Sequence, residues 1–125
     1  MNVLIDSSGW IEFFCKGSKT EVFAKIIEKA DKKTCITPSI VLFEVFKKVL
    51  IDFGEVNASE AIAYILDSTS IIDLTQKTSI HAAQLSAERK IPMADSIILA
   101  TAIEQNAKIF TSDKHFGKMP EAQLL

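Results

Sequence analysis

Short apolar segments alternate with segments of helical periodicity along this sequence, and this alternation limits its possible folds more than any other feature. The apolar segments have the length and composition of buried strands. We expect strands at residues 3–5, 34–37, 70–74 and 108–111, with a brief last strand at 123–125. Because strands that alternate with helices form parallel sheets covered on both faces, the pattern predicts a three-layer α/β/α fold with a central parallel sheet.

Helix-capping residues mark where the helices begin. Ser7 and Ser8 are expected to cap a short first helix, and Pro38 to occupy the first position of a longer one. Thr75 is a further cap, and Asn57–Glu60 has the form of a capping box. The expected helices cover residues 10–14, 20–30, 38–53, 57–66, 76–88 and 93–105.

The length of 125 residues predicts a single domain, residues 1–125, with a core that needs no covalent staple. Cys15 and Cys35 suit a reduced, cytoplasmic protein and are expected to be buried as small apolar side chains. The sequence contains no run of 18 apolar residues and no signal peptide, so we expect no membrane span.

Charge and hydropathy bear on the partners. The net charge of −2 argues against a nucleic-acid partner, although lysines crowd the N-terminal half, either as a basic face or as solvated helix faces. The hydrophobic fraction of 48% indicates a sheet covered on both faces, apolar surface kept for a partner, or both. We predict a homodimer joined through Phe43, Phe46, Leu50 and Phe53, unless that series faces the core. The lysines are Lys16, Lys19, Lys25, Lys29, Lys32, Lys33, Lys47 and Lys48.

Four acidic residues fall where this fold gathers its ligands. Asp6 ends the first strand, Asp113 follows the fourth, and Asp95 lies in the first turn of the helix after Pro92. Glu44 is a single charge among six apolar residues. Because the carboxyl ends of parallel strands meet at one edge of the sheet, we expect these acids to share a pocket.

Each acid also has an ordinary explanation as a helix-entry residue, a helix-dipole partner or a turn former, and Glu44 could pair with Lys47 and Lys48. Together, however, four neighbouring carboxylates repel one another unless a cation neutralises them. Oxygen ligands suit Mg²⁺ or Mn²⁺, ions that promote phosphodiester hydrolysis. His81 and His115 lack metal-ligand spacing and are expected to be structural or surface residues.

With these residues in view, the sequence resembles the PIN-domain family and, within it, the VapC-type toxins of prokaryotic toxin–antitoxin pairs. The resemblance covers essentially the whole chain. Leu4–Ser8 resembles the first family motif and Thr37–Ser39, with Glu44 beyond, the second. Met93–Ala102 is similar to the third motif and Thr111–Phe116 to the fourth. Four motifs in order at family spacing make the resemblance specific.

The resemblance implies a PIN-like, Rossmann-like fold and a Mg²⁺- or Mn²⁺-dependent endoribonuclease. Asp6, Glu44, Asp95 and Asp113 would be the catalytic, metal-coordinating acids. Ser7 and Thr111 would be supporting hydrogen-bonding residues. The family also implies an RNA substrate, frequent homodimers and a small antitoxin partner.

Other functions remain open from the sequence alone. A haloacid-dehalogenase-like phosphatase also begins with a strand-end Asp, but it needs a second acid at the position of Ser8. A phosphate-binding NTPase would need a glycine-rich loop after a strand, which is absent. The remaining alternatives are a non-catalytic PIN-like binding module and a PIN nuclease that processes RNA outside a toxin–antitoxin pair.

Overall fold

A parallel sheet of five strands forms the centre of the molecule, in the order β3-β2-β1-β4-β5. The computed structural model describes residues 1–125. Every pair of neighbouring strands is parallel, and β1 lies between β2 and β4. The strands are β1 (Asn2–Ile5), β2 (Cys35–Pro38), β3 (Ser70–Ile72), β4 (Ala107–Thr111) and β5 (Ala122–Leu124).

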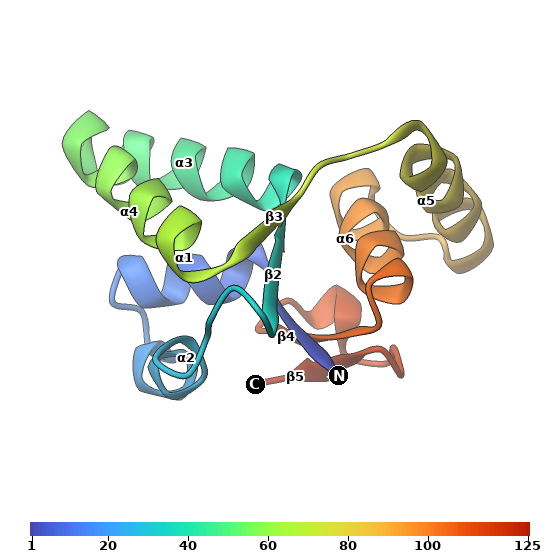
Figure 1. Cartoon of the computed structure of the whole chain (residues 1–125), viewed down its shortest axis with the longest axis horizontal. Helices are drawn as coiled ribbons and strands as arrows, with labels where there is room; N and C mark the ends of the chain where they lie inside the picture. Colours follow the sequence, from blue (N-terminus) through green and yellow to red (C-terminus); the bar gives the residue numbers. More distant parts are fainter.

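Six α-helices cover the sheet, with α1 to α4 on one side and α5 and α6 on the other (Figure 1). Helices on both faces of a parallel sheet confirm the predicted three-layer α/β/α fold. The helices are α1 (Ser7–Phe14), α2 (Thr20–Ile27), α3 (Ser39–Phe53), α4 (Glu55–Ser68), α5 (Gln76–Arg89) and α6 (Met93–Glu104), with one 3-10 turn, η1 (Lys114–Phe116).

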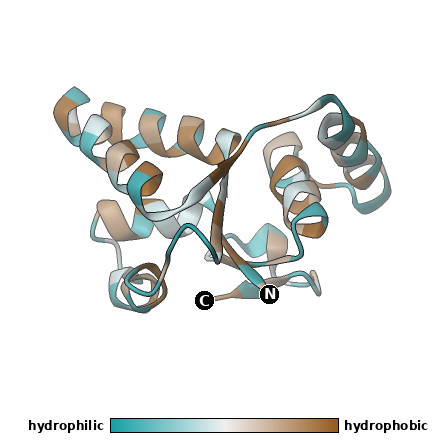
Figure 2. Cartoon of the chain, in the orientation of Figure 1, coloured by the Kyte–Doolittle hydropathy of each residue, from teal (hydrophilic) through white to brown (hydrophobic).

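The core is one cluster of 23 buried hydrophobic residues that joins the sheet to both helical layers. Helix α6 is its most enclosed element, because residues 96–102 are all buried between β4 and α5. Figure 2 shows hydrophobic residues over α3 and α6. Cys35 is buried and Cys15 half-buried, and both are free thiols. None of the helices combines the length and the apolar character that a membrane crossing requires.

Three of the predicted helix starts are wrong in detail. The side chain that caps α1 is Asp6, which precedes Ser7 and Ser8. Pro38 ends β2 with an extended backbone, so its helix begins one residue later. The proposed capping box lies inside α4, where the Asn57 side chain donates to the carbonyl of Phe53. The cap at Thr75 is confirmed, since its hydroxyl accepts from the amide of Thr78.

The predicted interface residues of α3 do not form its buried face, which consists of Val41, Val45 and Val49. Phe43 is 64% exposed, Leu50 40% and Phe53 52%. Phe46 is half-buried and packs against the core. Half of the large hydrophobic residues that remain exposed lie on α3 and α4, so the molecule has an apolar surface without a partner there.

Gly54 joins α3 to α4 in a backbone conformation (φ 88°, ψ 175°) that side chains rarely adopt. A Cβ atom at this position would meet no atom within 4 Å, so any cost of adding one is conformational. We expect Gly54→Ala to lower the free energy of unfolding by about 1–3 kcal/mol. Urea unfolding measures this change. Lys90→Gly is the control. Lys90 caps α5 with a φ of 56°, a conformation that favours glycine, so the stability of this variant should be unchanged or slightly higher than that of wild type.

Candidate active site

The pairing of β1 with β4 brings Asp6 next to the start of the fourth motif, Thr111–Phe116. Ile5 pairs with Phe110 at the carboxyl edge of the sheet, and the amide of Asp6 donates to the carbonyl of Phe110 at 3.2 Å. The Thr111 hydroxyl then donates to Oδ2 of Asp6 at 2.5 Å. Two segments that lie 105 residues apart in sequence are thereby joined at this edge.

Asp6 is buried, and its carboxylate serves both the fold and the candidate site. Oδ1 caps α1 by accepting from the amide of Gly9 at 3.1 Å, and it also accepts from the Ser8 hydroxyl at 2.6 Å. With the bond from Thr111, three donors fix the orientation of this carboxylate. A carboxylate held in this way is preorganised for a ligand.

The same hydroxyl groups continue toward Asp113. The Ser8 hydroxyl accepts from the amide of Ser112 at 2.9 Å, and the Thr111 hydroxyl accepts from the amide of Asp113 at 2.8 Å. The backbone that carries Asp113 is therefore held by the residues that hold Asp6. Ser8 has this role although only Ser7 and Thr111 were predicted as supporting residues.

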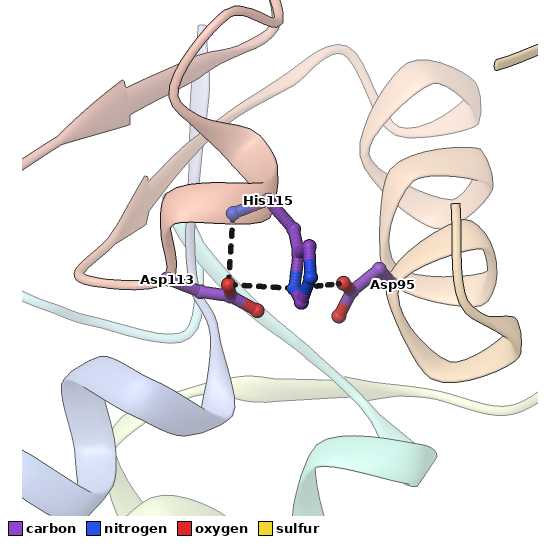
Figure 3. Close-up of side chains that lie close together, drawn as sticks. All are labelled: Asp95, Asp113 and His115. Carbon is purple, nitrogen blue, oxygen red and sulfur yellow. Dashed lines mark hydrogen bonds and ion pairs between the residues drawn. The ribbon is translucent and has the colours of Figure 1, made fainter. Parts of the chain in front are cut away.

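Asp95, Asp113 and His115 form the closest group of ligand-type side chains (Figure 3). Asp95 comes from the first turn of α6, whereas Asp113 and His115 come from the turn after β4. Nδ1 of His115 lies 3.0 Å from Oδ1 of Asp113 and 3.4 Å from Oδ2 of Asp95. His115 was expected to be a structural or surface residue; its side chain is exposed, but it also contacts both carboxylates. Its position two residues after Asp113 was the available signal.

Glu44 reaches the same region from α3. Its Oε1 accepts from the Ser7 hydroxyl at 2.9 Å, so Ser7 links Glu44 to the residue next to Asp6. The alternative pairing of Glu44 with Lys47 and Lys48 does not occur, and Lys48 pairs with Asp52 instead. Glu44 is thus oriented toward the acids and not toward the lysines.

The electrostatics show that the acids interact. Burial raises the pKa of Asp6 from 3.8 to about 6, and the charge of Asp113 adds to this rise. Burial also raises the pKa of Asp95 to about 6, helped by the charges of Asp113, Glu44 and Asp6 and opposed by His115. The charges of the neighbouring acids therefore make Asp6 and Asp95 harder to ionise. A bound cation would remove this repulsion, and the oxygen-rich donor set suits Mg²⁺ or Mn²⁺.

His81 does not belong to the group of Asp95, Asp113 and His115. Its Nδ1 is 2.7 Å from Oε2 of Glu104, near the end of α6 that is remote from Asp95. The Thr78 hydroxyl donates to the other oxygen of Glu104. This group joins α5 to α6 and confirms that His81 has a structural position.

Comparisons with known proteins agree with this architecture. Residues 3–122 match the sequence profile of the PIN domain family. A toxin–antitoxin complex from Klebsiella pneumoniae contains a chain with a TM-score of 0.78 and 22% identity, over 98% of this chain and 96% of that one. VapBC2 from Rickettsia felis, bound to a promoter DNA fragment, gives a TM-score of 0.75 and 21% identity, over 100% and 98%.

VapC20 from Mycobacterium tuberculosis, a toxin that cleaves the Sarcin-Ricin loop, gives a TM-score of 0.75 and 16% identity. The match covers 89% of this chain and 88% of that chain. At such identities the likeness to solved structures shows the fold alone. A comparison with curated protein sequences gives no match to this chain.

The raised pKa of Asp6 predicts how the metal-free protein responds to pH. Because the folded state holds the proton more tightly than the unfolded state, stability falls as pH rises from about 4 to about 6. Asp6→Asn removes this loss and can keep the hydrogen bonds, since its amide can donate to Thr111. In EDTA at pH 8 we expect the variant to be about 1–3 kcal/mol more stable than wild type. At pH 4 this advantage should vanish.

Chemical unfolding at both pH values measures the difference. Asp73→Asn, at an exposed acid outside the site, is the matched control and should change neither value appreciably. A loss of stability in Asp6→Asn at pH 8 would show that burial, with the charge of Asp113, does not destabilise the ionised carboxylate.

Proposed function

This chain belongs to the PIN domain family, and on that premise we propose that it is a VapC-type nuclease: a divalent-metal-dependent endoribonuclease that hydrolyses RNA phosphodiester bonds. The observation that carries the proposal is the convergence of Asp6, Glu44, Asp95 and Asp113 at the carboxyl edge of the sheet, where the charges of the neighbouring acids help to raise the pKa values of Asp6 and Asp95. This is the edge at which α/β folds bind ligands. RNA as the substrate draws further support from the fold shared with VapC20, an RNA-cleaving toxin.

The four acids would hold the ion and orient the groups around it. Mg²⁺ or Mn²⁺ supplies the charge that activates water and stabilises the leaving oxygen. Asp95 and Asp113 face each other from α6 and the turn after β4, so together they can bind a cation between these elements. Thr111 fixes Asp6, and Ser7 fixes Glu44, each through a hydrogen bond.

Purified protein should cleave RNA in Mg²⁺ or Mn²⁺ and lose this activity in EDTA. Asp6→Asn should lower the cleavage rate by at least about 100-fold. Losing a residue that binds the metal costs more activity than losing a residue that only hydrogen-bonds to a metal ligand. Gel assays on end-labelled hairpin and single-stranded RNA measure the rate. Asp73→Asn removes a charge away from the site and should keep full activity.

Two results would contradict the nuclease proposal. One is cleavage that persists in EDTA, and the other is a fully active Asp6→Asn protein. RNA binding without any cleavage would favour the non-catalytic binding module instead. The thermal stability of each variant must be measured alongside, so that unfolding is not mistaken for loss of chemistry.

An antitoxin is the protein partner that we propose. The solved relatives with this fold include toxin–antitoxin complexes. In this chain an apolar cavity of about 530 Å³ lies between α1, α3 and α4, and Phe13, Phe14, Phe53 and Tyr64 line it. Such a cavity can receive apolar side chains of a partner helix. The product of a short neighbouring reading frame should therefore bind the protein and inhibit its cleavage of RNA.

The exposed apolar face of α3 supports the proposed homodimer. Leu50 lies on this face with Phe43 and Phe53, whereas Ile51 projects from a different side of the helix. We expect wild-type protein to be dimeric and Leu50→Glu to be monomeric at tens of micromolar. Ile51→Glu is the matched control. Ile51 follows Leu50 in the sequence and is 70% exposed, and this variant should remain dimeric. Light scattering coupled to gel filtration distinguishes the two states, and a monomeric wild type would refute the dimer.

A further inference from the structure

We propose that His115 supplies a nitrogen ligand to the ion of this site, so that the site prefers Mn²⁺ to Mg²⁺. The inference rests on the proposed function and refines it, because four acids alone would offer only oxygen ligands. The structure adds an imidazole to the same group, from the turn that carries Asp113.

The distances from the imidazole nitrogen to the two carboxylates fit neighbouring positions in one coordination sphere. Oxygen and nitrogen ligands at about 2.1 Å from an octahedral ion lie about 3.0 Å apart when adjacent and about 4.2 Å apart when opposite. Nδ1 of His115 lies 3.0 Å from one carboxylate oxygen of Asp113 and 3.4 Å from one of Asp95. All three donor atoms lie within 4.8 Å of one another.

The orientation of the ring also suits a cation. Nδ1 faces two carboxylate oxygens, as Figure 3 shows, and a lone pair placed there would be repelled by both. A proton on Nδ1 can satisfy the arrangement in the metal-free protein. A metal ion can take the place of that proton, because it binds the lone pair and both oxygens at once.

The turn holds His115 in position from two sides. The His115 amide donates to Oδ1 of Asp113 at 2.9 Å, and the next residue, Phe116, is fully buried. The imidazole itself is 64% exposed and is free to adjust to an ion. Imidazole suits transition metals, whereas Mg²⁺ favours oxygen ligands, which gives the predicted preference for Mn²⁺.

The test uses the intact protein loaded with Mn²⁺ alone. Pulsed electron paramagnetic resonance detects a nitrogen nucleus bonded to Mn²⁺, and the chain has only two histidines, His81 and His115. We expect a nitrogen signal in wild type and in His81→Gln, and none in His115→Gln. Titration should show Mn²⁺ binding weakened about 10-fold or more by His115→Gln, with Mg²⁺ binding changed less than about 3-fold.

Mn²⁺ that binds wild type without a nitrogen signal would overturn the inference and leave the nuclease proposal intact. In that case His115 only bridges the carboxylates of the metal-free protein and leaves when the ion arrives. A signal lost in His81→Gln and kept in His115→Gln would also overturn it. A wild type that binds neither Mn²⁺ nor Mg²⁺ would contradict the nuclease proposal as well.

Discussion

The buried carboxylate of Asp6 is the contact on which the rest of the site depends. It caps α1, accepts from the hydroxyl at the end of β4 and, through Thr111, fixes the backbone of Asp113. Gly9 must be a glycine for this arrangement, since a Cβ there would lie 2.6 Å from the ring of Phe23. These contacts join the start of the first helix to the end of the fourth strand, beside the backbone pairing of β1 with β4. The hydrogen bonds of this carboxylate organise the site, whereas its burial disfavours its negative charge.

The positions of the acids at the strand ends could be predicted because topology decides them. Once the strands are parallel, Asp6 and Asp113 must reach the same edge, whatever their side-chain details. The helix caps could not be predicted equally well, because several neighbouring polar residues compete for each cap. Asp6, and not Ser7 or Ser8, caps α1 because the helix begins at Ser7, directly after Asp6 and earlier than the predicted start at residue 10.

The part played by His115 depends on a turn, and turns have no periodicity from which to place a side chain. The spacing of His115 to other histidines or cysteines gave no signal, because its neighbours at the site are carboxylates from two elements. Glu44 was easier to identify, since a lone charge in an apolar helix needs a reason. Its hydrogen bond to Ser7, however, joins residues 37 positions apart and follows only from the packing of α1 on α3.

The burial of helix α6 determines which side of the site can move. Seven successive residues of this helix are enclosed on every side, so Asp95 stands on an element with almost no freedom to shift. The facing turn, in contrast, exposes His115 and its neighbour Lys114 to solvent. If the site binds a metal as proposed, ions of different radius would be accommodated by displacement of the turn, because the helix is held in place. Amide hydrogen exchange would register this asymmetry as slow exchange in α6 beside rapid exchange in η1.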